Sequence, residues 1–298
     1  MVSIVICTYN RQEYLPKCLM HLKNQSCAAS DFEIVLINNN SSDDTDSICL
    51  TFLKDNPKLN VSYFIEKNPG LSFARNRGIK EAKGDVICFI DDDGFAISEY
   101  VKIIAEFTEN ELYNSFMAFG GKVIPCYNEG KSPDWISPYI SGLVSEVDLG
   151  VNVKAFTKKY PAGCNMIFRK EFFEKQGGFN TDLHTRGDDK FIFLKLKEAG
   201  HKILYIPTLE VSHFIDDYRL EKSFIIRLSK VIGQSEAIRL KNKSAFQKLL
   251  KQTEYLFKLS AALVISAWFV LRGDALKAAY IIRVRWYVFI GYYLNEKL

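Results

Sequence analysis

The sequence contains no CxxC pair, and its seven cysteines stand far apart, at positions 7, 18, 27, 49, 88, 126 and 164. Zinc sites usually take closely spaced thiols, and disulfide-rich secreted domains carry even sets of cysteines. The odd, dispersed set therefore argues against both, and it predicts reduced thiols in a cytoplasmic compartment.

Long apolar runs, low-complexity tracts and internal repeats are also missing. The first apolar run, VSIVIC at 2–7, reaches polar TYNRQE after too few residues to act as a signal peptide. Residues 259–271 are too short to span a bilayer, and residues 278–294 contain Arg283 and Arg285. We expect these two segments to form packed core helices or an amphipathic hairpin in the plane of a membrane.

The chain as a whole has little net charge, but the two signs are unevenly distributed. Residues 219–298 hold 15 Lys and Arg against 5 Asp and Glu, a net charge of +10, and residues 1–218 hold 24 against 30, a net charge of −6. A basic, aromatic-rich tail on an acidic body predicts an anionic partner for the tail, such as a membrane surface, and we expect no nucleic-acid partner.

What is present is a regular alternation of strand and helix patterns in the first ninety residues. Continuous apolar runs, typical of strands buried on both faces, stand at 2–7, 33–37, 61–65 and 86–90. Helix-type spacing lies between them, at 12–24, 45–55 and 71–83. This alternation predicts a parallel sheet with right-handed crossovers. In the third helix, Leu71, Ala74 and Gly78 are predicted to share one face, with Arg75 pointing away from it.

Polar residues follow three of these strands, at 8–11, 38–44 and 91–93. Since ligands bind at the carboxyl ends of parallel strands, the three clusters predict one site at one edge of the sheet. Asp91, Asp92 and Asp93 would repel one another, and a divalent cation would make their crowding favourable.

The segment 95–215 is less regular. We expect a helix near 98–112, a strand near 117–124, and a proline-containing loop that holds Trp135. A further helix is predicted from Asp189 to Ala199, ended by Gly200 and followed by a strand. Asp188 and Asp189 stand at its start, where a single Asp would suffice as a cap.

Five stretches resemble the family 2 glycosyltransferases: SIVICTYNR, EIVLINNNSSDDT, NPGLSFARNRGIKEAKGDVICFIDDDG, GCNMIFRKEFFEKQGGFN and GDDKFIFLKLKEAGH. They cover roughly residues 2–215. The resemblance implies a GT-A fold, an α/β class with a Rossmann-like, mostly parallel central sheet flanked by helices, here with a C-terminal helical extension. It also implies transfer of a sugar from a nucleotide-diphosphate sugar to a hydroxyl, with inversion.

Within this resemblance, IDDDG corresponds to the DxD motif of the family. Asp93 would bind Mg²⁺ or Mn²⁺, and Asp91 or Asp92 would accept hydrogen bonds from the ribose. A plain acidic turn is the alternative. His213 resembles a histidine that some relatives bring to the metal or the pyrophosphate, although a buried structural histidine would look the same in sequence, and Arg219 could join it there.

The resemblance also implies a set of nucleotide-binding residues. Thr8, Tyr9 and Arg11 match the loop around the nucleotide, and Arg75 matches a position near the pyrophosphate, with a solvated helix face as its alternative. Asn38 departs from the Asp that usually contacts uracil, so a UDP-sugar is the default donor and guanosine or thymidine nucleotides stay open.

The catalytic base is expected from the GDD stretch. Asp189 holds the usual position of the base, Asp188 is a rival, and helix capping is the alternative to both. Trp135 and Asn165 resemble acceptor-side positions, and a structural role in the core is equally open for each of them.

These expectations combine into one interpretation. Residues 1–95 form the nucleotide-sugar half, residues 96–218 the acceptor-binding half and residues 219–298 a basic helical region that contacts a membrane. The enzyme would act on a glycan or lipid-linked acceptor in polysaccharide or glycoconjugate synthesis, at the cytoplasmic face of the membrane. Two alternatives stay open: a non-catalytic binding protein on a degenerate transferase fold, and a sugar nucleotidyltransferase, although CTYNRQ is no glycine-rich phosphate loop.

Overall fold

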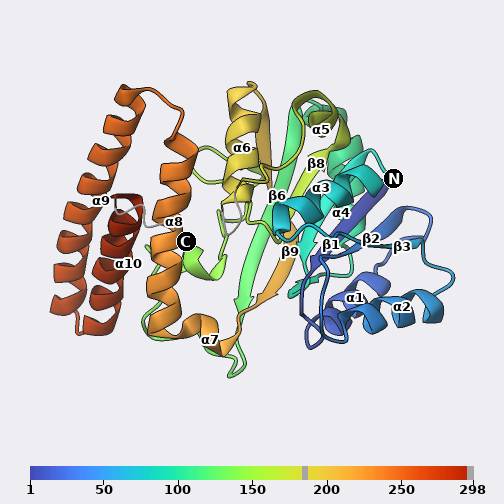
Figure 1. Ribbon diagram of the computed structural model, residues 1–298, viewed down its shortest axis with the longest axis horizontal. Helices are drawn as coiled ribbons and strands as arrows, with labels where there is room; N and C mark the ends of the chain where they lie inside the picture. Colours follow the sequence, from blue (N-terminus) through green and yellow to red (C-terminus); the bar gives the residue numbers. More distant parts are fainter. Residues whose placement is uncertain (183–186, 294–298) are drawn as a thin grey trace. The chain divides into compact units, whose positions relative to one another are not determined.

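The structure is a computed structural model that describes residues 1–182 and 187–293 (Figure 1). Its chain divides into two compact units. The first unit holds Met1–Pro125, residues 146–182 and Asp188–Phe214, and the second holds Cys126–Ser145, residue 187 and residues 215–293.

The first unit is built on one mixed sheet. Its strands are β1 (Val2–Thr8), β2 (Phe32–Asn38), β3 (Val61–Ile65), β4 (Val86–Asp91), β5 (Gly94–Ala96), β6 (Phe116–Cys126), β7 (Lys154–Ala155), β8 (Met166–Arg169) and β9 (Lys202–Phe214). They follow the order β3-β2-β1-β4-β8-β6-β9-β5, and β7 pairs with β9. The pairs β3–β2, β2–β1 and β1–β4 are parallel, whereas β8 pairs antiparallel with β4 and β6. The predicted parallel sheet is confirmed for the first ninety residues.

The helices of this unit are α1 (Leu15–Lys23), α2 (Thr45–Asp55), α3 (Leu71–Glu81), α4 (Tyr100–Glu109), α5 (Lys170–Gln176) and α6 (Asp188–Glu198). The first three connect the parallel strands, as the helix spacing predicts. The helix expected near 98–112 is shorter, because the chain leaves α4 at Asn110 and makes a 3₁₀ turn at Glu111–Tyr113. The last expected strand is longer, since β9 continues unbroken to Phe214.

Burial explains why the first strands read as continuous apolar runs. Every residue of β2 is buried, and Ile4, Val5 and Ile6 of β1 are fully buried. Strands covered on both faces need apolar side chains at consecutive positions. The core continues into a cluster of phenylalanine rings in which Phe89, Phe168, Phe173 and Phe179 pack edge-on or tilted, with ring centroids 4.9 to 6.3 Å apart.

The acidic trio lies where the chain passes from β4 to β5. Asp91 ends β4, and Asp92 and Asp93 form the turn before Gly94 begins β5. A Cβ atom at Gly94 would lie 2.9 Å from Ile90 Cγ2 and 3.0 Å from the Asp91 carbonyl oxygen. A side chain at this position would therefore crowd the turn that carries Asp92 and Asp93.

The second unit is helical. It contains α7 (Asp217–Leu220), α8 (Lys222–Leu240), α9 (Ala245–Leu271) and α10 (Ala275–Tyr293), with a 3₁₀ turn at Ser141–Val144. The helix α9 begins with a capping box, in which the Gln247 amide donates to Ser244 Oγ and Gln247 Oε1 accepts from the Ser244 amide. The core of this unit includes Trp135, Tyr255, Phe269 and Ile281.

The helix α9 corrects one expectation. Residues 259–271 alone are too short to cross a bilayer, but the helix begins at Ala245 and is 27 residues long. Its most apolar eighteen-residue window has a mean hydropathy of 1.5 and is 22% buried. By length and composition α9 could therefore cross a membrane. Core helices of soluble proteins meet the same two criteria, so the criteria alone do not make α9 a membrane helix.

Candidate active site

The sheet brings the three predicted polar clusters to one edge. In the register of the parallel strands, Thr8 lies beside Asn38 and Cys7 beside Asp91. The loops after β1, β2 and β4 therefore leave the sheet side by side. Three segments that are far apart in the sequence meet at this edge, as the strand-end rule predicts.

Asp93 is the centre of a buried polar cluster. Its Oδ1 lies 3.1 Å from His213 Nε2, and its Oδ2 accepts a hydrogen bond of 2.9 Å from Arg11 Nη2. Both Asp93 and His213 are nearly fully buried. His213 lies inside β9 and not beyond a strand as expected. It pairs with Gly94 of β5, and its imidazole contacts Asp93.

Asp92 lies beside this cluster and is also buried. The nearest cation is Arg11, whose Nε lies 3.6 Å from Asp92 Oδ1. Burial, followed by the charge of Asp93, raises the pKa of Asp92 above its ordinary value, and Arg11 and the Thr8 hydroxyl oppose this only in part. Because Asp92 and Asp93 are neighbouring carboxylates and both are buried, positive charge is stabilised here.

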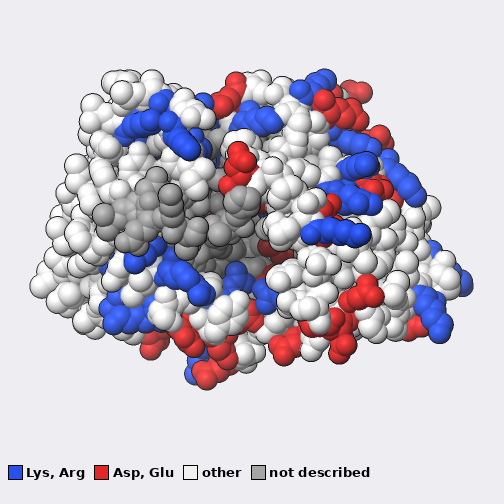
Figure 2. Space-filling model, viewed as in Figure 1, with Lys and Arg blue, Asp and Glu red and all other residues white. Residues whose placement is uncertain are grey.

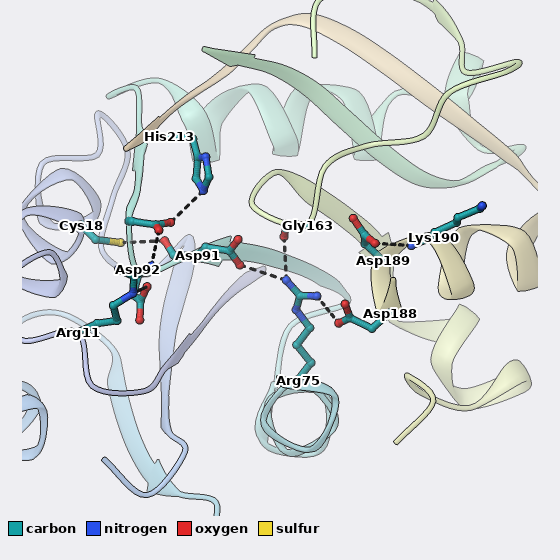
Figure 3. Close-up of polar contacts among 11 residues, drawn as sticks. Arg11, Cys18, Arg75, Asp91, Asp92, Gly163, Asp188, Asp189, Lys190 and His213 are labelled. Carbon is teal, nitrogen blue, oxygen red and sulfur yellow. Dashed lines mark hydrogen bonds and ion pairs between the residues drawn. The ribbon is translucent and has the colours of Figure 1, made fainter. Parts of the chain in front are cut away.

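Arg75 joins the acidic trio to the start of α6. Its guanidinium is buried and forms an ion pair with Asp188, while Nη2 contacts Asp91 Oδ1 at 3.1 Å and the Gly163 carbonyl oxygen at 3.3 Å (Figure 3). Burial alone would lower the pKa of Arg75, but Asp188 and Asp91 raise it above its ordinary value. The solvated-face alternative for Arg75 is wrong, since it points inward on α3 while Leu71 is exposed.

The two aspartates of α6 have different surroundings. Asp188 is buried, and its carboxylate is paired with Arg75. Asp189 is half-buried, and its Oδ1 accepts a hydrogen bond of 2.6 Å from the Lys190 amide. Both lie in the first turn of α6, where negative charge is favourable. Of the two carboxylates, Asp188 therefore forms the ion pair with Arg75 and Asp189 is the more exposed.

The loops after β1 and β2 are tied together by hydrogen bonds between side chains and backbone. Asn10 has a positive φ of 51°, its amide donates to Ser41 Oγ at 3.0 Å, and its Oδ1 accepts from the Ser42 amide at 2.8 Å. Between these fixed loops, Tyr9 is 59% exposed. An aromatic ring held outward at a strand end can stack on a nucleobase.

Asn38 is buried, and both ends of its side-chain amide form hydrogen bonds. Its Oδ1 accepts from the Ser41 amide at 2.8 Å, and its Nδ2 donates to the Tyr63 hydroxyl at 2.8 Å. The Tyr63 hydroxyl in turn donates to Asp46. Tyr63 and Asp46 carry no recognisable motif, so only the fold shows that they support this position.

The donor groups at this edge fit a divalent cation. Ligand atoms of Asp91, Cys164 and His213 lie within 4.8 Å of one another. Within the described residues, the buried His213 Nδ1 has no hydrogen-bond partner. Carboxylate oxygens suit Mg²⁺ and Mn²⁺, and imidazole nitrogens suit transition-metal ions. Cys164 was not predicted here, because a single cysteine gives no sequence signal for such a place.

Two predicted acceptor-side residues lie in cores. Asn165 is fully buried, with Oδ1 accepting from the Tyr100 hydroxyl at 2.8 Å and Nδ2 donating to the carbonyl oxygens of Lys122 and Leu209 at 3.1 and 3.0 Å. Trp135 belongs to the second unit, where its indole stacks on Tyr280 with centroids 4.7 Å apart. Arg219 also belongs to the second unit, in α7. The acceptor-side role of Trp135 and Asn165, and a role of Arg219 beside the metal, stay predictions.

Residues 3–177 match the family model described as glycosyl transferase family 2. Among curated proteins, the chain is 24% identical over 247 residues to a glucosyl-dolichyl phosphate glucuronosyltransferase of Haloferax volcanii, covering 80% of this chain and 76% of that protein. It is 29% identical over 198 residues to the GalNAc(5)-diNAcBac-PP-undecaprenol beta-1,3-glucosyltransferase of Campylobacter jejuni, covering 65% of this chain and 59% of that protein.

Solved structures with a similar fold include a mannosyltransferase from Pyrobaculum calidifontis in complex with GDP-Man and Mn²⁺. That comparison has a TM-score of 0.63 and 19% identity, and it covers 95% of this chain and 85% of the other. S. aureus TarS 1-349 in complex with UDP-GlcNAc gives a TM-score of 0.55 at 16% identity, over 81% of this chain and 66% of the other. The likeness shows a shared GT-A fold.

Proposed function

Because the chain belongs to glycosyl transferase family 2, we propose that it transfers a sugar from a nucleotide-diphosphate sugar to a hydroxyl group, with inversion at the anomeric carbon. The observation that carries this proposal is the buried Asp93–His213–Arg11 cluster beside the Arg75–Asp91 pair. In that arrangement a cation-binding group stands next to a fixed guanidinium. Both kinds of group stabilise the charge that develops on a leaving diphosphate.

Asp93 and His213 would hold Mg²⁺ or Mn²⁺, with Asp91 or Asp92 facing the ribose. When bound, the ion would offset the negative charge that grows on the pyrophosphate as the glycosidic bond breaks. Arg75 would bind a phosphate oxygen, and its pairs with Asp188 and Asp91 fix the guanidinium in advance. Tyr9 would stack on the base, with Thr8, Arg11 and Asn38 completing the nucleotide site.

Asp189 would act as the general base. It would accept the proton of the attacking hydroxyl while that oxygen forms the new bond to the anomeric carbon and the diphosphate leaves from the opposite face. Support comes from the contacts of the two aspartates at the start of α6. Asp188 forms the ion pair with Arg75, whereas Asp189 Oδ1 accepts from the Lys190 amide.

The acceptor would be a glycan or a lipid-linked sugar. The two relatives from Haloferax volcanii and Campylobacter jejuni are named for substrates on dolichyl phosphate and undecaprenol diphosphate carriers. The net charge of +10 over residues 219–298 supports peripheral contact with an anionic membrane at its cytoplasmic face. Residues 1–95, 96–218 and 219–298 would then serve donor, acceptor and membrane.

A thermal-shift panel of nucleoside diphosphates with and without Mn²⁺ tests the donor site. A ligand that binds only the native state raises the melting temperature. We expect one nucleoside diphosphate to stabilise the protein only in the presence of the metal, with UDP as the default. Absence of stabilisation by every nucleotide would contradict the proposal, and so would turnover of a sugar nucleotide that survives EDTA.

A further inference from the structure

One side of α9 forms a long apolar surface that is exposed in the described part of the chain. Twelve positions make up this surface, called here the α9 face: Phe246, Leu249, Leu250, Thr253, Leu256, Phe257, Ser260, Leu263, Val264, Ala267, Val270 and Leu271. None of them carries a charge. The opposite side of the helix is buried in the core of the second unit through Tyr255, Ala262 and Phe269. In Figure 2 the surface over α9, at the left margin, is largely free of charged residues.

The α9 face repeats every seven residues. One row is Leu249, Leu256, Leu263 and Val270, and a second row is Leu250, Phe257, Val264 and Leu271. A repeat of seven with two large apolar side chains in each period is the pattern of a helix that packs against another helix. Contact with lipid requires apolar surface but imposes no such repeat.

Between the two rows runs a line of small residues. The small residues are Thr253, Ser260 and Ala267. Each comes four positions after a member of the first row and three positions after a member of the second row. Residues three and four positions apart are neighbours on a helix, so the small residues lie between the two rows. The hydroxyls of Thr253 and Ser260 donate to the carbonyl oxygens of Leu250 and Leu256 at 2.9 and 3.1 Å, so neither needs water. The face is therefore a shallow groove with two apolar ridges.

The size of the α9 face matches a stable protein interface. Its nine large side chains are between 52% and 87% exposed. Together they expose roughly 900 Å², close to the ~800 Å² that each partner contributes to a standard interface and more than most monomers leave open.

The charges beside the face favour a protein partner over an anionic lipid surface. Lys251 lies 3.3 Å from Glu236 and 2.9 Å from Glu254, and Lys258 also pairs with Glu254. Lys251 and Lys258 are thus each paired with a carboxylate of the same unit. The basic charge proposed to contact a membrane lies elsewhere on the helices.

We propose that the α9 face binds the α9 face of a second copy of this chain, antiparallel about a twofold axis at Ser260. Ser260 is the midpoint between Leu249 and Leu271, so the rotation that places Ser260 on Ser260 sets Thr253 opposite Ala267. The same rotation sets Leu256 opposite Val264 and Phe257 opposite Leu263, so each ridge residue meets an apolar partner. In the antiparallel arrangement the N-terminus of each helix lies beside the C-terminus of the other, so the two helix dipoles attract each other.

Sedimentation velocity on the full chain tests this pairing. We expect a dimer at micromolar concentration, and a monomer for the double variant Phe257→Lys with Val264→Lys. Both sites are exposed, so the circular dichroism spectrum should not change, whereas the melting temperature should lose the dependence on protein concentration that a dimer shows. Leu112→Lys is the matched control, since Leu112 is 79% exposed in the other unit, and it should stay dimeric. A monomeric wild type, or a double variant that stays dimeric, would overturn the proposal.

A second measurement tests the geometry and the rival occupant. Under oxidised glutathione, Ser260→Cys should form a disulfide-linked dimer and Leu112→Cys should not; equal cross-linking of both would contradict the antiparallel axis. Flotation on neutral phosphatidylcholine vesicles tests insertion of the face into lipid. If the wild type floats as a monomer and the double variant no longer floats, the α9 face binds a bilayer and the dimer proposal is wrong.

Discussion

Arg75 and Asp188 form a buried ion pair that links helix α3 to the first turn of helix α6, 113 residues further along the chain. Through its other nitrogen, the same guanidinium contacts Asp91 at the end of β4. The position of α6, and with it the position of Asp189, therefore depends on the arginine that faces the acidic trio. The proposed base and the proposed phosphate ligand are parts of one rigid arrangement.

The neighbouring aspartates of α6 should respond differently to removal of their charge. Asp188→Asn leaves the buried Arg75 without its main partner, so we expect a loss of about 3–5 kcal/mol in the free energy of unfolding. Asp189→Asn should leave stability nearly unchanged and lower kcat by about 100- to 10,000-fold, because a general base is lost. Urea denaturation and turnover assays on both variants measure these effects. A fully active Asp189→Asn variant would exclude Asp189 as the base.

Gly163 should be essential for the placement of Arg75. A Cβ atom at this position would lie 2.9 Å from Arg75 Nη2. Gly163→Ala should therefore push the guanidinium aside and reduce kcat/KM by about 100-fold, the effect expected from a misplacement near 1 Å. Gly142→Ala is the matched control, since a Cβ there has nothing within 4 Å. Equal activity of both variants would show that Arg75 does not need this position.

Asn165 is expected to act through stability. Asn165→Ala would remove the hydrogen bonds to the carbonyl oxygens of Lys122 and Leu209 and leave the Tyr100 hydroxyl with Cys88 Sγ, at about 1–3 kcal/mol for each buried group left unpaired. The melting temperature should fall while KM for the acceptor stays constant below the transition. A raised acceptor KM with unchanged stability would instead support an acceptor-binding role.

The fold of the first ninety residues could be predicted because parallel strands buried on both faces leave continuous apolar runs. The same rule placed Thr8, Asn38 and Asp91 at one edge. His213 was expected outside a strand because the polar residues of EVSHF hide the continuation of β9, which only its pairing with β5 reveals. The start of α9 at Ala245 was missed because lysines interrupt its apolar pattern before residue 259.

The roles of individual polar side chains were harder to predict than the edge where they gather. Spacing on α3 correctly predicts that Ala74 and Gly78 are buried, but Leu71 is exposed. Arg75 turns inward because the charges that draw it come from β4 and α6, which spacing does not reveal. The bonds of Asn165 go to backbone carbonyl oxygens 43 and 44 residues away, which no sequence motif records. Long-range partners of this kind are defined by the fold alone.

The central claim is that Asp93 and His213 hold a divalent cation that the donor site requires. Titration of Mn²⁺ into the metal-stripped protein, followed by electron paramagnetic resonance of the free ion, measures this binding directly. We expect one site per chain in the wild type, and an affinity at least about tenfold weaker in Asp93→Asn and in His213→Ala. Binding of Mn²⁺ with equal affinity in the wild type and in both variants would contradict the account.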